Sequence, residues 1–554
     1  MNKLVLFFGI LTISYSTFAQ SIPFKIQKSE LFKDEYKNST IVFTKENNDG
    51  GILIVRSFSG SSFSSSEGFY IENYNSNLVQ TKKFEFDMKH PKNQKFNVVL
   101  GICSFENEIQ IIEIYYDSNQ KLYICQSNCI DEDFKITKKE LFKLTNEEIE
   151  KNGSFTLEST FYNRMDEVWT NDNSGMFDGE TDNFSVVNNQ SLMSKKGKSE
   201  IIMTVNEANN AFAIAIDYNV RNAEYLKLYL FDNKLNKKIE TEFSRDNIQD
   251  QKYVFQNLQV DPNGSSIYLL GKTYTDSQKK KNVGGKYLFE LTKISSENQK
   301  SQFIDTKENF ISSLKSIFHN NQLICIGFYS EINDSRYKGI SCFKLDTNSL
   351  EILQEKHNPF SQQFMIDKYG EAKDKELKFL TFKNCFFTAN NDLILNAQEE
   401  YSETSLLNRS NSMNGISNNQ TIHHRDDIVS AKLSIEGDLI WARNINKKQR
   451  FHFAVDKNYA SYTTTINGDI SYYFINTDEK IKELKNDRIE FKGSDKSNLN
   501  LIRINNNGDF EYEKILDDEE NEVPFMVANG ISVGNSVFFL GKKGTTKQLL
   551  KVTL

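Results

Sequence analysis

The sequence contains little proline, cysteine, histidine or tryptophan, and it shows almost no helical periodicity. Among 554 residues there are 5 prolines and 6 cysteines. So few cysteines in so long a chain do not form a disulfide scaffold. Scarce proline suits β-strands, whose pleated surfaces also favour the abundant phenylalanine (43) and tyrosine (24). The sequence also lacks a P-loop, a dinucleotide fingerprint and a Gly-x-Ser-x-Gly elbow in a strand–turn–helix context.

The charge balance argues against two further classes of protein. The formal net charge is −8, whereas a nucleic-acid binder needs a basic surface, so we predict no nucleic-acid partner. After the first twenty residues, no segment is long and apolar enough to span a bilayer. With 38% hydrophobic residues the chain can still bury a sizeable core.

Residues 1–19 have the pattern of a secretory signal peptide. A short positive start (Met1 to Lys3) precedes an apolar run from Leu4 to Ile13, and Thr17 and Ala19 supply small residues before the cut. The apolar run has about half the roughly 20 residues that a membrane anchor needs. We therefore expect cleavage after Ala19 and export through the inner membrane, to the periplasm or the cell exterior.

A strand–turn–strand unit recurs along the chain. Its clearest copy turns at Asp261-Pro262-Asn263-Gly264, between two apolar strands. Further copies turn near residues 47, 106, 209, 320, 391, 467 and 534. The spacings between successive turns run from 53 to 76 residues, a length that is typical of four-stranded propeller blades. One spacing is larger, at 103 residues. Eight hairpins predict eight blades, with seven or nine as alternatives.

The sequence thus predicts an all-β fold, a single large β-propeller over residues 20–554. The widest gap holds a polar insertion at residues 144–198, where a ninth, degraded blade is the alternative. The C-terminal segment Gln548–Leu554 ends on a strand without an outer partner, and the early strand Pro23–Phe32 could supply one. Pairing of the N- and C-terminal strands would close the ring and remove exposed edges.

The densest polar cluster is His423-His424-Arg425-Asp426-Asp427, which follows a Ser/Asn-rich loop at 401–420. A metal or acid–base site would need histidine and carboxylate to converge. Because adjacent strand residues point to opposite faces, only one histidine could join a given site. The alternative is a solvated loop end. We take as candidate binding residues His423, His424, Asp426, Asp427 and Trp441, and we identify no catalytic residue, metal-ligand set or cofactor.

Three other segments contain residues that suit a specific chemistry. Ser434–Trp441 superficially resembles a sialidase Asp box, but it occurs once and has Glu436 in the Asp position, so we expect a turn. Thr170–Asp182 is rich in oxygen ligands that calcium accepts, yet its spacing departs from the EF-hand loop, and an exposed polar loop is the default. Cys325 and Cys342 lie in strands expected in one blade, where a disulfide or two buried free thiols are both open.

Several structural turns give the chain a resemblance to uncharacterised exported bacterial β-propeller-like proteins. The resemblance covers about residues 200–554 and rests on Val260–Tyr274, Ile324–Tyr329, the Leu433–Gln449 turn and Tyr459–Tyr462. It implies the propeller fold and export, and it brings no established activity or catalytic residue.

Taken together, these features predict a non-enzymatic, exported propeller that acts as a protein-interaction platform at the cell envelope. Its partner would be an envelope or secreted protein, with outer-membrane machinery as one candidate, and the polar segments 144–198 and 402–420 would decorate the binding face. The alternative is a carbohydrate-active or other hydrolytic propeller, with carboxylates roughly 5–10 Å apart in the central funnel. A small-ligand sensor with an apolar pocket is a third possibility.

Overall fold

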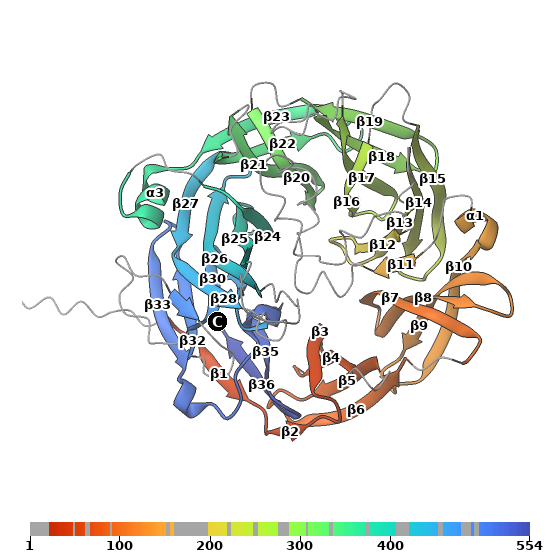
Figure 1. The fold of residues 1–554 in the computed structure, drawn as a ribbon, viewed down its shortest axis with the longest axis horizontal. Coiled ribbons are helices and arrows are strands. Elements are labelled where there is room, and N and C mark those ends of the chain that lie inside the picture. Colours follow the sequence, from red (N-terminus) through yellow and green to blue (C-terminus); the bar gives the residue numbers. More distant parts are fainter. Residues whose placement is uncertain are drawn as a thin grey trace, which may run out of the picture.

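The computed structural model shows eight sheets arranged around a central axis (Figure 1). It describes residues 22–554 apart from 48–49, 61–66, 89–90, 151–155, 160–197, 219–222, 247–252, 275–286, 306–308, 332–335, 373–376, 406–419, 452–457, 478–488 and 492–497. The predicted all-β propeller with eight blades is confirmed. The Thr170–Asp182 segment, considered for calcium, lies outside the described residues.

Each blade is an antiparallel sheet whose first strand lies nearest the axis. Blade 1 comprises β3 (Asn38–Glu46), β4 (Ile52–Ser59), β5 (Glu67–Tyr74) and β6 (Gln80–Asp87). Blade 2 comprises β7 (Gln94–Phe105), β8 (Glu108–Asp117), β9 (Leu122–Ile130) and β10 (Ile136–Thr145). Blade 3 comprises β12 (Lys198–Val205), β13 (Ala211–Asp217), β14 (Ala223–Asp232) and β15 (Lys237–Asp246), with β11 (Thr156–Ser159) parallel to β12. Blade 4 comprises β16 (Tyr253–Val260), β17 (Ser266–Tyr274), β18 (Tyr287–Ser295) and β19 (Gln299–Ile304).

The remaining blades follow in chain order. Blade 5 comprises β20 (Asn309–His319), β21 (Gln322–Glu331), β22 (Tyr337–Leu345) and β23 (Ile352–Pro359). Blade 6 comprises β24 (Leu380–Phe387), β25 (Leu393–Ser405), β26 (Gln420–Leu433) and β27 (Leu439–Ile445), joined by β28 (Lys447–Phe451) and β31 (Ile489–Phe491). Blade 7 comprises β29 (Tyr462–Asn467), β30 (Ile470–Thr477), β32 (Asn498–Ile504) and β33 (Phe510–Leu516). Short helices are α1 (Asn146–Glu150), α3 (Gln362–Tyr369), η4 (Asp518–Glu520) and η5 (Val527–Asn529).

Blade 8 joins the two ends of the chain. Its strands β34 (Ile531–Val533), β35 (Ser536–Lys543) and β36 (Thr546–Thr553) are completed by β1 (Lys25–Lys28), with Lys25 opposite Thr553. The short strand β2 (Phe32–Lys33) pairs with the other end of β36. The predicted pairing of N- and C-terminal strands is therefore confirmed. It gives β36 an outer partner and leaves no gap in the ring of blades.

The eight predicted hairpins are the first turns of the eight blades. The turn at Asp261 shows why aspartate favours this position. Its carboxylate accepts hydrogen bonds from the backbone N–H groups of Ser265 and Ser266, at 2.6 and 2.8 Å. Gly264 takes a φ of +64° at the tightest point of that turn. No ninth blade occurs in the part of the chain that the structure describes. Of the 144–198 segment it describes the end of β10, α1, β11 and residue 198, where β12 begins.

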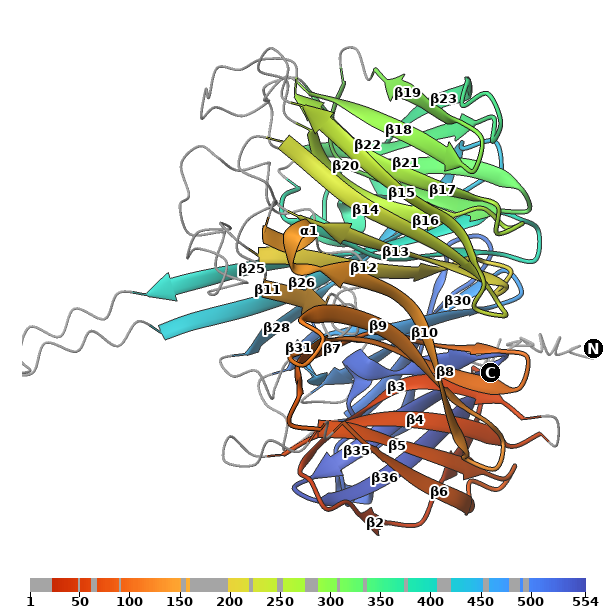
Figure 2. The same cartoon turned by 90° about the vertical axis from the view of Figure 1, so that its right-hand side faces the viewer.

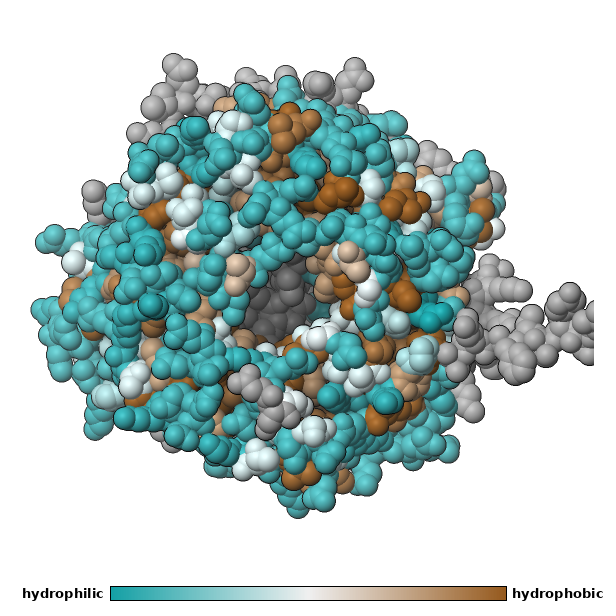
Figure 3. All heavy atoms as spheres, turned by 180° about the vertical axis from the view of Figure 1, so that it is seen from behind, coloured by the Kyte–Doolittle hydropathy of each residue, from teal (hydrophilic) through white to brown (hydrophobic). Residues whose placement is uncertain are grey.

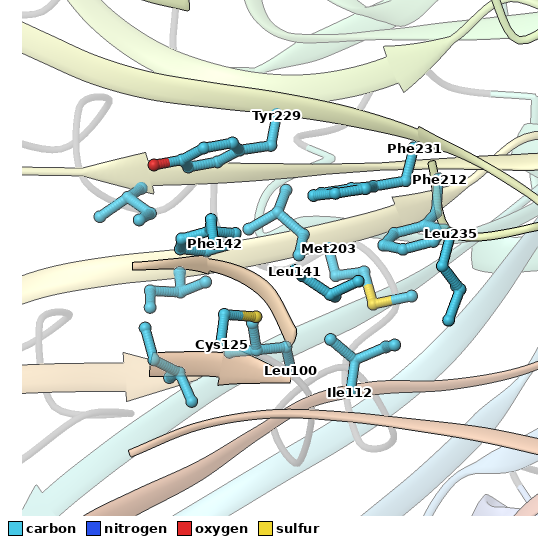
Figure 4. Packing of buried hydrophobic residues seen from close by; sticks show 14 of the residues in the cluster. Leu100, Ile112, Cys125, Leu141, Phe142, Met203, Phe212, Tyr229, Phe231 and Leu235 are labelled. Atoms are coloured by element: carbon cyan, nitrogen blue, oxygen red, sulfur yellow. The ribbon is translucent and has the colours of Figure 1, made fainter. Parts of the chain in front are cut away.

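Apolar side chains fill the wedges between neighbouring blades. Between blades 2 and 3, Phe142 and Tyr229 stack with ring centroids 3.9 Å apart (Figure 4), and Phe212 stacks on Phe231. In several turns between third and fourth strands, a buried leucine adopts the left-handed conformation that glycine usually occupies. The three cases are Leu78, Leu235 and Leu350, with φ between 55° and 65°. Burial of each leucine, about 1.5–3 kcal/mol, offsets a backbone cost of about 1–2 kcal/mol.

The two blade-5 cysteines remain free thiols. Cys325 is opposite Phe343 and Cys342 is opposite Ile326 in the β21–β22 register. Side chains on opposite faces of a sheet cannot be joined by a disulfide. All six cysteines are free, so the disulfide alternative is wrong and the free-thiol alternative is confirmed.

The two faces of the ring differ. The extended hairpin of β25 and β26 projects from one of the two faces (Figure 2). This hairpin reaches further from the ring than the other strands of the fold in that view. Among the described residues no helix has the length and apolarity needed to cross a membrane.

Candidate functional site

The predicted polar cluster lies in strand β26, where the ladder with β25 is interrupted by a β-bulge. Gln398 is opposite Ile428 and Glu400 is opposite Arg425, so the pair Asp426-Asp427 faces a single residue, Glu399. A bulge bends its strand and strengthens the local twist. The outer strand also changes at this level, because β27 pairs with β26 below the bulge and β28 pairs with it above.

The two aspartates attach the outer strand β28 at the point where the regular ladder is broken. Asp427 Oδ1 accepts the backbone N–H of Lys447 at 3.0 Å, and Asp426 Oδ1 accepts that of Gln449 at 3.2 Å. Asp426 is 6% exposed and Asp427 is 0% exposed. The alternative of a solvated loop end is therefore wrong. Both aspartates are buried inside the sheet, where their carboxylates accept backbone N–H groups of β28 in place of the interrupted ladder. The preceding loop is also shorter than predicted, since β25 continues to Ser405 and β26 begins at Gln420.

Buried cations surround the aspartates. Lys368, from helix α3, places its ammonium 2.7 Å from Asp427 and 2.8 Å from Glu399. Burial alone would lower the pKa of Lys368, but these carboxylates outweigh it and raise the pKa. Glu400 lies 2.5 Å from Lys383 and 3.5 Å from Arg425. The network therefore connects the helix outside the ring with Lys383 on the innermost strand.

Lys447 is the most strongly perturbed cation of this network. It is 0% exposed, and its ammonium donates to the carbonyl of Arg425 and, at 2.9 Å, to Gln449 Oε1. Burial lowers the pKa of Lys447 to about 7, although the neighbouring Asp426 partly opposes that shift. An amine with this pKa is chemically reactive in principle, but burial removes Lys447 from contact with any substrate.

Buried Lys447 should therefore make a contribution to stability that rises with pH above neutrality. Between the folded pKa of Lys447 near 7 and the unfolded value of 10.5, the unfolded chain binds more protons, so the free energy of unfolding increases with pH. Lys547, whose pKa burial lowers to about 8, contributes with the same sign. In urea unfolding at pH 7 to 8.5, each lysine should contribute a positive slope of up to about 1.4 kcal/mol per pH unit. At higher pH the buried thiols, whose pKa burial raises, contribute with the opposite sign. Lys447→Met and Lys547→Met should each flatten the slope, whereas the exposed Lys138→Met should not. If the slope of Lys447→Met equals that of the wild type, this result would contradict a pKa of Lys447 that is lowered by burial.

The two histidines lie on opposite faces of β26, as their adjacency predicts. His424 is buried and stacks on Tyr401 with ring centroids 4.3 Å apart, and Tyr401 donates a 3.0 Å hydrogen bond to Asp426. Burial lowers the pKa of His424. His423 instead lies 2.8 Å from Ser402 Oγ and stacks on Phe451. The structure thus joins His424, but not His423, to the aspartate network.

Trp441 lies away from this network. Its indole N–H donates to the carbonyl of Asn506 at 3.0 Å, in the turn between β32 and β33 of blade 7. A Cβ at Gly508 would lie 3.1 Å from the indole, so that turn needs a glycine, which has a φ of +89°. Trp441 therefore packs blade 6 against blade 7. The Ser434–Asp438 segment before it is a hairpin turn, as expected.

The second candidate site is a central cavity of about 400 Å³. Figure 3 shows the molecule hollowed at its centre, with apolar residues along part of the rim. One side of the cavity is lined by the aliphatic residues Ile41, Val42, Leu100, Ile102, Met203 and Val205 from blades 1–3. The facing side carries the polar residues Lys383, Asn384, Ser461, Thr463, Thr464 and Asn529 from blades 6–8, together with Tyr462, Ala528, Gly530 and Ile531.

The ionisable groups around the cavity do not form an acid pair. Among the described residues that line it, none is aspartate or glutamate. No cluster of three or more His, Cys, Asp or Glu side chains suited to a metal ion occurs in the described part of the chain. The described lining of the cavity therefore holds no carboxylate pair of the kind that the hydrolytic alternative requires.

Inner-strand bulges are a feature that the sequence did not reveal. In blades 1, 2 and 6 the register of the first two strands skips Val42, Leu100 and Lys383, and all three residues line the cavity. A bulge leaves the extra residue unpaired and redirects its side chain. No glycine or proline marks Val42 or Lys383, so their sequence neighbourhood carries no signal for the bulge.

Comparisons with known proteins concern the fold. No profile of a protein family matches the chain, and no curated protein matches its sequence. A prolyl endopeptidase from a study of two such enzymes is 6% identical, with 91% of this chain and 54% of that chain covered and a TM-score of 0.39. The chain thus spans about half the length of that enzyme.

Two further solved structures are covered almost completely by the match. The β-propeller domain of the trilobed protease from Pyrococcus furiosus is 8% identical, with 88% of this chain and 98% of that chain covered and a TM-score of 0.33. The polysaccharide lyase Uly1 is 11% identical, with 84% and 94% covered and a TM-score of 0.34. At these values the comparisons assign no activity to the chain.

Proposed function

We propose that this protein is an exported protein-interaction platform at the cell envelope and that it binds its partner through the β25–β26 hairpin. The partner is another envelope or secreted protein, with outer-membrane machinery as one candidate. The observation that supports this proposal is the projection of the hairpin from one face of the ring (Figure 2).

The outer part of the hairpin offers unpaired strand edges. Beyond His423, which still pairs with β28, the register continues through Glu403–Ile422 to Ser405–Gln420. Among the described residues these last pairs have only each other as neighbours in the sheet. A two-stranded ribbon is marginally stable alone, and its free edges accept a further strand from another protein.

The buried network of blade 6 supplies the rigid base that such a ribbon needs. Asp426 and Asp427 tie β28 to β26, and Lys368 ties helix α3 to the same position. A binding surface built on a fixed base loses less conformational entropy when the partner docks.

Shortening the hairpin should abolish partner binding while leaving the propeller folded. The variant joins Glu403 to Ile422 through an Asn-Gly turn and deletes residues 404–421, because these two residues are opposite each other in the register. A matched control joins Tyr274 to Tyr287 in blade 4 in the same way. Affinity capture from envelope extracts should recover a reproducible partner with the wild-type and control proteins but not with the shortened hairpin. Equal recovery with the shortened hairpin would overturn the proposal, and so would the absence of any reproducible partner.

Protein purified from the same extracts should begin at Gln20, and retention of Met1 would contradict export.

A further inference from the structure

We propose that the central cavity is a second binding site, and that its ligand is a short, uncharged peptide with aliphatic side chains. The inference extends the proposed protein-binding role to the channel, but it rests on the cavity and not on the hairpin. Its volume of about 400 Å³ falls within the range of about 300–1,000 Å³ that is typical of small-molecule sites.

One wall of the cavity suits aliphatic side chains. Val42 and Leu100 are bulge residues that the ladder does not pair, and Met203 lies beside them on the neighbouring blade. Methionine is flexible and adapts to ligands of irregular shape. Gly101 lies against this methionine, since a Cβ there would come within 2.7 Å of the Met203 sulfur. Tyr462 on the opposite wall is the one aromatic residue among the described residues that line the cavity. Six aliphatic residues outnumber it, which favours an aliphatic ligand over a stacked sugar ring.

The opposite wall supplies hydrogen-bonding groups that match amides. The side-chain oxygen of Asn529 is buried in a residue that is 8% exposed, and none of the described protein groups donates to it. A buried acceptor without a donor is costly, so this oxygen is suited to accept an N–H from a ligand. Asn384, Thr463 and Ser461 lie along the same wall.

The inner strands add backbone groups to this polar wall. Strands β3, β7, β24 and β29 are each the terminal strand of their sheet and pair on one side only. Their second edge faces the axis of the ring (Figure 1). Such edges present N–H and C=O groups to a ligand, and a peptide backbone can pair with them.

The charges at the cavity favour a neutral ligand. Lys383 is the single Lys, Arg, Asp or Glu among the described residues that line the cavity, and Glu400 lies 2.5 Å from its ammonium. Because this ion pair is already complete, a ligand carboxylate would meet Glu400 and a ligand ammonium would meet Lys383. Either charge would also lose its hydration without gaining a new partner.

Isothermal titration of the full-length mature protein with the capped peptide acetyl-Leu-Ala-Leu-amide tests this inference. We expect saturable one-to-one binding, with at least tenfold weaker binding of uncapped Leu-Ala-Leu, which carries both terminal charges. Octyl glucoside offers an alkyl chain and hydroxyls without amides, and it should also bind at least tenfold more weakly. Absence of saturable binding of the capped peptide, or tighter binding of octyl glucoside, would overturn the proposal.

Two variants locate the ligand. Val42→Trp should fill the cavity and abolish binding. Asn529→Leu removes an acceptor that has no protein donor, so it should weaken peptide binding at least tenfold while leaving the unfolding midpoint unchanged or higher. A purely structural role for Asn529 predicts the opposite, lower stability with unchanged binding. Binding as tight as wild type in a folded Asn529→Leu variant would contradict the site.

The shortened hairpin separates this inference from the proposed function. That variant should lose its envelope partner and keep its affinity for the capped peptide. Loss of both would show that the peptide binds at the hairpin and would overturn the channel site. Conversely, peptide binding without any envelope partner would leave the channel site standing and remove the hairpin proposal.

Discussion

Replacing Arg56 by methionine should lower the free energy of unfolding by about 3–5 kcal/mol, because it leaves buried Asp34 without its ion pair and leaves Glu72 only the 3.7 Å contact with Lys83. The guanidinium of Arg56 is 0% exposed and lies 2.6 Å from Asp34 and 2.7 Å from Glu72. It donates to both oxygens of each carboxylate. Urea unfolding, followed by far-ultraviolet circular dichroism, measures the loss.

The position of Asp34 makes this the largest expected effect on the ring. Asp34 directly follows β2, the N-terminal strand that pairs with the C-terminal strand β36. Arg56 and Glu72 belong to blade 1, so the ion pairs fix the closing segment to the next blade. We therefore expect limited proteolysis of the Arg56→Met protein to begin in residues 22–37. A matched control is Lys82→Met, which removes an ion pair with Asp133 whose two side chains are 52% and 90% exposed. Its cost should stay below about 1 kcal/mol. Equal losses in the two variants would contradict a special role for the buried pair.

The ion pair between Arg56 and Asp34 also makes the stability of the protein depend on pH in the acid range. Burial alone would raise the pKa of Asp34, but the hydrogen bonds and charge of Arg56 hold it below its usual range. The stability that this group provides is present above the unfolded carboxyl pKa of about 3.9. It is lost as the pH falls through the lower folded-state value.

Replacing Asp427 by alanine should cost a similar amount, about 3–5 kcal/mol, and should also weaken partner binding. Asp427 is 0% exposed and accepts hydrogen bonds from Lys368 at 2.7 Å, Asn444 at 3.2 Å and the backbone of Lys447 at 3.0 Å. Its loss leaves the buried backbone N–H of Lys447 without its acceptor, while Lys368 keeps Glu399 at 2.8 Å. It also removes one of the two carboxylates that tie β28 to β26. The base of the projecting hairpin then becomes mobile, so both thermal stability and envelope-partner capture should fall.

Asp438 provides the control in the same blade. It pairs with Lys356 at 2.8 Å in the turn between β26 and β27, with 57% of its side chain exposed. Asp438→Ala should cost below about 1 kcal/mol and leave partner capture unchanged. If Asp427→Ala is as stable as Asp438→Ala, the network does not support the hairpin.

Local turn chemistry made the architecture predictable. Asp261 caps the first turn of blade 4 with short-range hydrogen bonds, and Asn, Asp or Gly residues mark the first turns of the other blades, so the spacing of these turns predicted eight blades. Closure was predictable for a related reason. The C-terminal strand lacked an outer partner, and the N-terminal strand was unassigned.

The candidate site depends on long-range register, which local patterns do not encode. The sequence shows that the pair Asp426-Asp427 is polar. Its burial depends on the β-bulge in which both aspartates face the single residue Glu399 of β25. Lys447 and Lys368 come from separate elements that only the folded chain brings together. The Cys325–Cys342 alternative was resolved in the same way, because a one-residue offset in register places the two thiols on opposite faces.

The central claim, that the β25–β26 hairpin carries the partner-binding surface, is tested most directly by site-specific photo-crosslinking in cells. A benzoyl-phenylalanine placed at Glu403, whose side chain is 63% exposed, reports contacts of the hairpin, and one at Asp133, 90% exposed in a turn of blade 2, serves as the reference. The account predicts a discrete adduct from position 403 and none from position 133. An adduct of equal intensity from both positions, or none from position 403, would contradict it.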